Sequence, residues 1–476
     1  MAWDYLIIGA GTAGIPAAIF ASRRGARVLL IDAAPTVGGT LHIARGQISA
    51  AETHLQKAKG IADSVDAHYD DVMRLSQGTA DPEIVKLAVR EASGTVNWLL
   101  EAGLVPLPDQ PVTGESPGRL GYATPRYLWG EKMGKAILAV LEKELEPEVS
   151  SGRIDIRVNA RATELLRDAS GGVIGARVMI DNREEEFLAR YTLLTTGGYS
   201  FNPELFEELT GAPAYTGGAY PFARGDGILL TKSLEAGVRN GDLHRPGLGA
   251  ILSGDKFPAT IFARFNTMPE ERMPWEIWVD SSGRRFMRED EANTYDREKI
   301  FAKLPKLRYS VVFDEDIFQA APPGVAQAYP GVAQWTREQI AAQFDAHPMF
   351  IRADTLAELA AGIGVDPDRL EETVRRYNAG VANKSDEFGR AFMPMPIVRP
   401  PFYAIVLLAH SVTSAAGLTV DGSLRVLNSR GVPIPGLYAA GELLGSGATL
   451  GNAFVPGMMI GPAMSLGRML GMQLPL

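Results

Sequence analysis

The chain has 476 residues, of which 46% are hydrophobic and 22% are charged, as is typical of a globular protein of about two or three domains. Its net charge of -9 disfavours binding to nucleic acid, because an acidic surface repels phosphates. The absence of cysteine excludes disulfides, thiolate nucleophiles, cysteine-ligated zinc and iron–sulfur clusters, and the six histidines show no metal-ligand spacing.

The sequence shows no pattern typical of membrane insertion or secretion. No apolar run approaches the roughly 18 residues of a membrane span. The first residues also lack a basic segment followed by an apolar segment and a cleavage site. We therefore expect a cytoplasmic protein without a membrane span.

The first forty residues have the pattern of a βαβ unit that binds a dinucleotide. Buried strands are predicted over 4–8 and 27–32, with a helix between them. The turn after the first strand is a GxGxxG, in which the glycines allow a tight turn, a close approach to pyrophosphate and close helix packing. The start of the helix offers free N–H groups to the phosphates. The candidate cofactor contacts in this turn are Gly9, Gly11, Ala13 and Gly14.

The end of the second strand adds further candidates. Asp32 follows this strand and is placed to accept hydrogen bonds from ribose hydroxyls. Gly38 and Gly39 resemble the paired glycines that follow the second strand in flavoproteins, where the backbone again approaches phosphates and flavin. An NAD dehydrogenase does not need these glycines, so the pattern favours FAD.

Motifs along almost the whole chain resemble those of the fumarate reductase / succinate dehydrogenase flavoprotein superfamily, which includes the 3-ketosteroid Δ1-dehydrogenases. The motifs are GGTLHIARGQISA at 38–50, LTTGGY at 194–199, GDG at 225–227, GRRF at 283–286 and PIPGLYAAGE at 433–442. The resemblance implies an α/β fold, with a Rossmann-like FAD-binding domain and an inserted α+β capping domain. It places the active site between the two domains.

The same resemblance divides the chain. It implies a discontinuous FAD-binding domain over 1–236 and 399–476, and a capping domain over 237–398. Alternating apolar and polar positions over 151–190 predict a β-meander within the FAD-binding domain.

Further cofactor contacts are implied by the motifs of the superfamily. Glu442 would bind the ribityl chain, and the start of the last helix would direct its amides at the flavin pyrimidine, where negative charge builds on reduction. Thr40 stands where a histidine linked to flavin would be, so we expect noncovalent FAD. The residues implied are Thr40, Ala162, Gly197, Gly198, Glu442, Met459 and Ile460.

The residues that bind dicarboxylates in fumarate reductases are changed here. Thr413 replaces the histidine of the HTMGG-type motif, and the segment 448–453 lacks the arginine of NRLGGNA. The histidine of QxHPT is also missing, because His244 precedes its position. These changes argue against succinate or fumarate as the substrate. Arg45, near the expected flavin, could hold a substrate carboxylate or a phosphate.

The candidate catalytic residues are Tyr295, Arg297 and Gly457. The segment PGMMIGPAM resembles PGATIGPAM of the ketosteroid dehydrogenases, which implies that the Gly457 amide polarises a ketone. Allowing two inserted residues, Tyr295 matches the tyrosine that takes the proton, whereas Arg297 is nearer to the arginine of fumarate reductases. Tyrosine ordinarily titrates near 10, so a base needs a neighbouring cation such as Arg288 or Arg297. The alternative is that the arginines over 284–297 form a solvated charged face.

The sequence thus predicts an FAD-dependent oxidoreductase that acts on CH–CH bonds. The leading hypothesis is a desaturase, or dehydrogenase, that introduces a C=C bond α,β to the carbonyl of a cyclic ketone, such as an oxocyclohexanecarboxylate or a 3-ketosteroid. The alternatives are an enoate reductase of the fumarate reductase type and a non-catalytic flavin-binding subunit. A small-molecule substrate and an external electron acceptor are the expected partners.

Overall fold

The computed structural model describes residues 3–116, 118–247, 249–327, 333–411 and 413–475. Its larger part is built on a sheet in which the strands follow the order β18-β19-β8-β1-β2-β5. Neighbouring strands from β19 to β5 are parallel, and β18 is antiparallel to β19. The bounds are β1 (Trp3–Ile8), β2 (Val28–Ile31), β5 (Ile154–Arg157), β8 (Arg183–Leu194), β18 (Arg425–Leu427) and β19 (Pro433–Ala439).

The strands at the centre of this sheet are apolar because both faces of the sheet are covered. The last four residues of β1 and all of β2 are buried, as is usual for parallel strands. β6 (Ala160–Arg167) and β7 (Val173–Ile180) continue from β8 as an antiparallel meander, as the alternation over 151–190 predicts.

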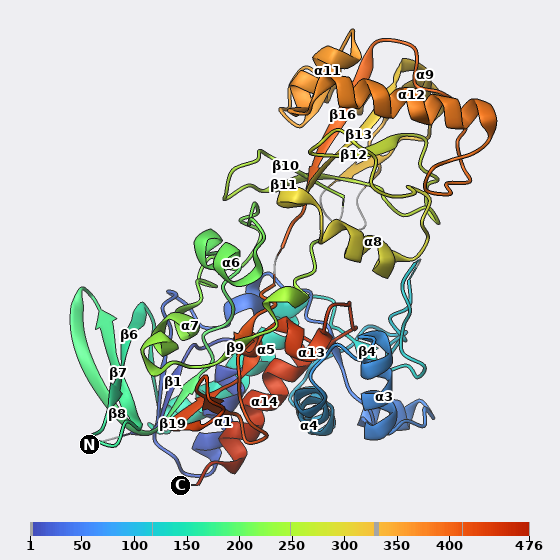
Figure 1. Ribbon diagram of the computed structural model, residues 1–476. Coiled ribbons are helices and arrows are strands. Elements are labelled where there is room, and N and C mark those ends of the chain that lie inside the picture. The colour runs from blue at the N-terminus through green and yellow to red at the C-terminus, as the bar shows by residue number, and fades with distance from the viewer. Residues whose placement is uncertain (1–2, 117, 248, 328–332, 412, 476) are drawn as a thin grey trace.

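Helices pack on this sheet and on one another. The last helix of the chain lies against the first, and the pair also contacts α4, so the two ends of the chain meet in one core (Figure 1). The bounds are α1 (Gly14–Arg23), α4 (Pro82–Glu101), α5 (Gly134–Ser150) and α14 (Ile460–Gln473).

Shorter elements complete the larger part and carry many of the predicted motifs. They are η1 (Gly39–His42), β3 (Ile48–Ser49), α2 (His54–Ala58), α3 (Val65–Leu75), β4 (Tyr127–Leu128), α6 (Pro203–Thr210), α7 (Asp226–Thr231), η2 (Lys232–Leu234), β9 (Val238–Arg239), η3 (Gly241–Leu243), β17 (Gly417–Leu418), η5 (Gly441–Leu444) and α13 (Ser446–Leu450).

The smaller part has its own sheets and its own hydrophobic core, formed by side chains between 250 and 408. One sheet has the order β10-β11-β14 and the other β12-β13-β16-β15. The strands are β10 (Ala250–Leu252), β11 (Ile261–Phe265), β12 (Ile277–Asp280), β13 (Arg308–Asp314), β14 (Val325–Gln327), β15 (Phe350–Ala353) and β16 (Phe402–Leu408). The helices are α8 (Thr294–Phe301), η4 (Pro305–Leu307), α9 (Glu315–Ala320), α10 (Arg337–Gln343), α11 (Leu356–Ile363) and α12 (Pro367–Asn383).

The smaller part stands above the larger part in Figure 1, with α8 at its lower edge. The domain boundaries at 236 and 399 remain a proposal. β16 lies within the range proposed for the FAD-binding domain, yet it pairs with β13 and β15 in a sheet of the smaller part. β9 lies within the range proposed for the cap, yet it pairs with β17. The chain therefore passes between the two parts near 240 and after 408.

Candidate flavin and active site

A cleft of about 1200 Å³, partly open to solvent, lies where β1, β2 and β19 end. Of the predicted cofactor contacts, those that line it are Gly9, Gly11, Ala13, Asp32, Gly39, Thr40, Ala162, Gly197, Glu442, Met459 and Ile460. Three others, Gly14, Gly38 and Gly198, lie behind this lining.

The glycines of the first turn leave no room for side chains. A Cβ at Gly9, where φ is 109°, would lie 2.4 Å from the Thr195 carbonyl oxygen. A Cβ at Gly14 would lie 1.9 Å from the carbonyl oxygen of Gly9. At Gly11, by contrast, the nearest atom to a Cβ is the Gly39 Cα at 3.7 Å, so the open side of this glycine faces the cleft. A ligand can therefore approach the backbone of Gly11 closely.

The glycines behind the lining hold its parts together. A Cβ at Gly38 would lie 2.8 Å from the side chain of Leu138. A Cβ at Gly198 would lie 2.0 Å from the Ser414 hydroxyl, which accepts a hydrogen bond of 2.7 Å from the Tyr199 amide. Ser414 in turn donates its amide to Glu442 at 2.9 Å, so the 197–199 turn fixes the carboxylate that lines the cleft.

Two half-buried carboxylates face the cleft. Asp32 accepts hydrogen bonds of 2.7 Å from the amides of Ala10 and Ala34, one on each oxygen. Burial raises the pKa of Asp32 above its ordinary value, against the effect of these two amides. Burial likewise raises the pKa of Glu442, and the Ser414 amide opposes this shift. Both acids are placed to accept hydroxyl donors from a ligand.

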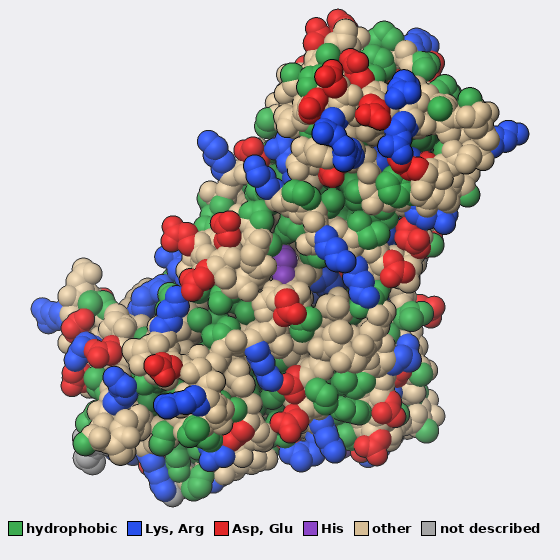
Figure 2. All heavy atoms as spheres, viewed as in Figure 1, with side chains coloured by type: hydrophobic (Ala, Val, Ile, Leu, Met, Phe, Trp, Pro, Cys, Tyr) green, Lys and Arg blue, Asp and Glu red, His purple; other side chains and the backbone are tan. Residues whose placement is uncertain are grey.

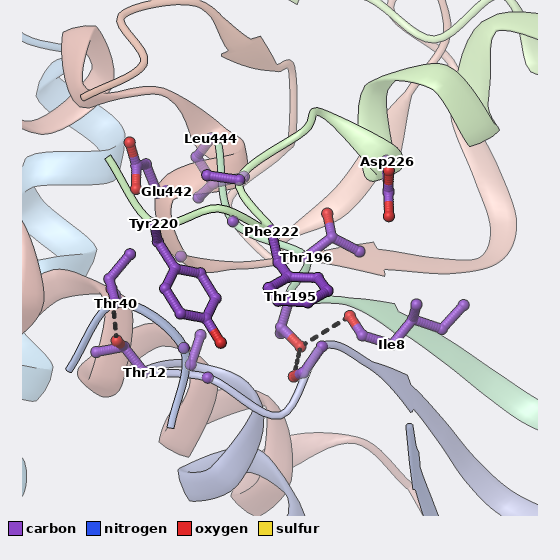
Figure 3. Close-up of a pocket in the computed structure, with 18 of the residues that line it drawn as sticks. Ile8, Thr12, Thr40, Thr195, Thr196, Tyr220, Phe222, Asp226, Glu442 and Leu444 are labelled. Atoms are coloured by element: carbon purple, nitrogen blue, oxygen red, sulfur yellow. Dashed lines mark hydrogen bonds between the residues drawn. The ribbon is translucent and has the colours of Figure 1, made fainter. Parts of the chain in front are cut away.

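Sequence reasoning missed several residues of the lining. Figure 3 shows the rings of Tyr220 and Phe222 projecting into the cleft, on the loop that leads into α7. The Thr196 hydroxyl also lines the cleft, and it is buried without a hydrogen-bond partner. In the sequence, the feature that could have indicated this part of the lining is the pair Tyr220 and Phe222, which precedes the GDG motif at 225–227. The other missed residues include Thr12, Thr195, Asp226, Ser446 and Thr449.

Two helix starts point at the cleft. Neither α1, after Ala13, nor α14, after Met459, has a side-chain cap, and both preceding residues line the cleft. The free N–H groups and the positive end of each helix dipole therefore face any ligand bound there. Together with the glycine cradle and the unpaired Thr196 hydroxyl, they fit the phosphates and polar ring edge of FAD.

Tyr295 joins the smaller part to the larger one. It lies in the first turn of α8, where Asn293 caps the helix by accepting the Tyr295 amide at 3.0 Å. The Tyr295 hydroxyl donates a hydrogen bond of 2.9 Å to the Asn452 side-chain oxygen. The Lys299 ammonium lies 4.1 Å from the centre of the tyrosine ring. This cation was missed, whereas the expected Arg288 pairs with Asp290 at 2.7 Å.

Arg297 is fully buried beside Tyr295. Its guanidinium donates to the Glu291 carbonyl at 2.6 Å and to the Thr294 hydroxyl at 2.9 Å, while its Nε has no partner. Burial lowers the pKa of Arg297, and nearby glutamates oppose the shift. Arg285 is also buried, paired with Glu289 at 2.6 Å, so the alternative of a solvated charged face is wrong for these two arginines.

Gly457 packs closely against Ser49 of β3. Its φ is 75°, and a Cβ there would lie 2.5 Å from both the amide nitrogen and the hydroxyl of Ser49. The preceding carbonyl, of Pro456, accepts hydrogen bonds from the Ser49 hydroxyl at 2.9 Å and from the Tyr122 hydroxyl. The loop therefore keeps one conformation between Asn452, which contacts Tyr295, and Met459, which lines the cleft.

Other residues that the sequence singled out lie apart from this arrangement. Arg45 is exposed. His244 is packed edge-on against Phe206, with its ring bonded to the Ser411 hydroxyl at 3.1 Å, and burial lowers its pKa to about 4.

Within the described ranges, no cluster of His, Asp or Glu is arranged to hold a metal ion. No helix in those ranges is long and apolar enough to cross a membrane.

Known proteins are similar to this chain over nearly its whole length. The chain is 28% identical over 475 residues to a fumarate reductase (cytochrome) of Shewanella frigidimarina, covering 98% of this chain and 76% of the relative. It is 25% identical over 555 residues to the 4-oxocyclohexanecarboxylate 2-dehydrogenase of Sinomonas cyclohexanicum, covering 98% and 92%. It shares the fold of the 3-ketosteroid Δ1-dehydrogenase from Sterolibacterium denitrificans, with a TM-score of 0.69 and 19% identity over 99% of this chain and 98% of that one.

The FAD_binding_2 family, described as an FAD binding domain, matches residues 4–454, which is nearly the whole chain. The relatives in sequence are a reductase and a dehydrogenase. The chain therefore belongs to this FAD-binding family, and it is an FAD-dependent oxidoreductase of the fumarate reductase superfamily.

Proposed function

We propose that the protein is a dehydrogenase that introduces a C=C bond α,β to the carbonyl of a cyclic ketone, such as an oxocyclohexanecarboxylate or a 3-ketosteroid. The observation that carries this proposal is the contact of the Tyr295 hydroxyl with Asn452. It brings a titratable group of α8 to the loop that carries Gly457 and continues to Met459, which lines the cleft that fits FAD.

The reaction removes a proton from the carbon α to the carbonyl and a hydride from the β carbon. When bound, FAD supplies the two-electron acceptor for the hydride, and an external acceptor then receives the electrons. Tyr295, as the phenolate, takes the proton, and the Lys299 ammonium lies beside its ring. The amide of Gly457 donates to the ketone oxygen and so makes the α carbon more acidic.

Arg297 has a different role in this proposal. Its guanidinium is fully buried and bonded to its own helix and to the Glu291 carbonyl. We assign it to holding the first turn of α8, and with it the position of Tyr295. The similarity to a 4-oxocyclohexanecarboxylate 2-dehydrogenase over 98% of the chain supports a small ring ketone as the substrate.

An enoate reductase is the second candidate. It is favoured by the 28% identity to a fumarate reductase and by the arginine that α8 retains beside Tyr295. Such an enzyme would catalyse the reverse reaction, the reduction of a C=C bond to a C–C bond. The changes at Thr413 and over 448–453 nevertheless argue against fumarate itself.

Anaerobic mixing of the FAD-loaded protein with a substrate panel tests the proposal. The panel is 4-oxocyclohexanecarboxylate, a 3-ketosteroid and succinate, with flavin absorbance as the readout. We expect bleaching by at least one ring ketone and none by succinate. Reoxidation of pre-reduced protein by an enoate, without bleaching by any ring ketone, would establish the reductase instead.

A further inference from the structure

Two arginines from opposite sides of the junction share one carboxylate next to the candidate active site. Arg119, on a loop of the larger part, donates to Glu298 of α8 at 2.9 Å. Arg245, where the chain enters the smaller part, donates to both oxygens of Glu298 at 3.0 Å. Lys and Arg side chains are visible along this junction in Figure 2. We refer to Arg119 and Arg245 as the arginine pair.

Both members of the arginine pair lie against the ring of Phe454. The guanidinium carbons of Arg119 and Arg245 lie 5.2 Å and 5.6 Å from the ring centre, within the range of cation–π contacts. Phe454 is two residues after Asn452, the partner of Tyr295, and three residues before Gly457. The pair therefore lies beside the groups to which the proposed function assigns proton transfer and ketone binding.

The two members of the arginine pair share one carboxylate, whereas the buried Arg126 has two carboxylates to itself. Arg126 is fully buried and pairs with both Asp63 and Asp71, at 2.6 and 2.7 Å. For the pair, Glu298 is the one carboxylate within ion-pair distance among the described residues. The side chains of Arg119 and Arg245 are also 34% and 24% exposed, so their remaining N–H donors can reach a ligand.

Arg119 and Arg245 lie close enough for their charges to repel each other. Two guanidiniums face a single carboxylate, and the charge of Arg245 adds to burial in lowering the pKa of Arg119. The buried Arg297 is a third cation nearby, with Glu270, Glu291 and Glu298 acting on it. A carboxylate bound by Arg119 and Arg245 would relieve their repulsion, and each guanidinium can bind it through two N–H donors.

We propose that Arg119 and Arg245 bind the carboxylate of the substrate, with Phe454 as the wall against which its ring packs. This proposal rests on the proposed function and restricts its substrate class. It assigns the substrate to cyclic ketones that bear a carboxylate, in place of neutral polycyclic ketones. Glu298 then serves as the positioning residue that holds both guanidiniums at the junction.

The test is binding of two matched probes to the FAD-loaded protein, measured by calorimetry. The probes are cyclohexanecarboxylate and cyclohexanecarboxamide, which have the same ring and differ in charge. We expect the wild-type protein to bind the acid at least tenfold more tightly than the amide. Arg245→Gln and Arg119→Gln should each lower that ratio by about tenfold or more, the effect expected for hydrogen bonds to a charged group. Arg245→Lys should retain part of it.

The control is Arg399→Gln, which removes an exposed arginine paired with Asp316 at 2.6 Å in the smaller part. This variant should keep the wild-type ratio. A purely structural role of the pair would weaken both probes equally, so an unchanged ratio in the Gln variants would overturn the proposal. An equal affinity of the wild-type protein for acid and amide would overturn it too. If no ring ketone bleaches the flavin, the proposed function fails, while the probe ratio still decides the role of the pair.

Discussion

At the scale of single residues, the predicted contacts with FAD depend on backbone geometry that the sequence specifies well. Gly14 is required because a Cβ would overlap the Gly9 carbonyl, a constraint local to the turn, whereas a Cβ at Gly9 would overlap the carbonyl of Thr195, which is distant in sequence. Tyr220 and Phe222 could not be predicted as part of the lining, because their place depends on how a loop between distant elements folds back over the cleft. The same is true of Lys299 beside Tyr295 until the start of α8 is known.

Asp32→Asn tests the acid at the edge of the cleft. The substitution replaces one acceptor oxygen by an NH2 group, which would face the amide of Ala10 or Ala34. One amide then loses its partner, and one acceptor for the ribose is lost as well. We expect FAD affinity to fall by about tenfold to a hundredfold, the usual range for hydrogen bonds to a charged group. Fluorescence titration of the flavin-free protein measures this, and unchanged affinity would remove Asp32 from the site.

Noncovalent FAD is a second prediction at this scale. Thr40 lines the cleft where a linking histidine would be, and the ring of His42 is bonded to the Val37 carbonyl at 2.8 Å. Acid precipitation should therefore leave the flavin in solution. Flavin absorbance that remains with the washed polypeptide would show a covalent bond.

At the scale of elements, the βαβ unit and the meander follow from periodicity and turn residues, so these could be predicted. The placement of α8 could not, because two inserted residues precede Tyr295 relative to the superfamily motif. Only the structure shows that the Tyr295 hydroxyl contacts Asn452 and that Arg297 is buried behind it. The assignment of β16 to the smaller part likewise depends on long-range pairing with β13.

The contact between α1 and α14 provides a prediction about element packing. A Cβ at Gly467 would lie 2.1 Å from the Ala13 carbonyl oxygen, so Gly467→Ala must push α14 away from the start of α1. We expect a loss of about 1–3 kcal/mol in the free energy of unfolding, typical of overpacking. Weaker FAD binding should accompany it, because Ala13 lines the cleft.

The matched control lies on the same helix. A Cβ at Gly461 would meet no atom closer than 3.8 Å, an ordinary contact, and alanine favours a helix over glycine by about 1 kcal/mol. Gly461→Ala should therefore keep the wild-type melting temperature or raise it. If both variants melt alike, close packing at Gly467 is not what holds the two helices together.

At the scale of the whole molecule, buried neutral histidines make stability depend on pH. Burial lowers the pKa of His68 and of His410 to about 3, and both of the His68 ring nitrogens lack partners. An unfolded histidine titrates near 6.5 and takes up a proton that the folded protein excludes. Stability is therefore present above pH 6.5 and is lost as pH falls from 6.5 toward 3.

His68→Phe tests this dependence. Phenylalanine keeps the edge-on ring contact with Tyr122, whose ring centre lies 5.5 Å away, and it cannot take up a proton. Each excluded proton costs about 1.4 kcal/mol per pH unit, so between pH 7 and pH 5 the variant should lose about 2 kcal/mol less than the wild type. Melting temperatures at both pH values measure the difference. Equal losses in the two proteins would show that His68 does not contribute.

The central claim is that Tyr295 takes the proton while bound FAD is reduced, and stopped-flow bleaching of the flavin by 4-oxocyclohexanecarboxylate tests it most directly. The variants are Tyr295→Phe, which removes only the hydroxyl bonded to Asn452, and Arg297→Lys, which keeps the charge. We predict that Tyr295→Phe slows bleaching by about 10²–10⁴-fold, the usual contribution of a positioned acid–base group. Arg297→Lys should cost less, because it acts through the position of Tyr295. Bleaching at the wild-type rate in Tyr295→Phe, with none in Arg297→Lys, would contradict the claim and assign the proton to the arginine.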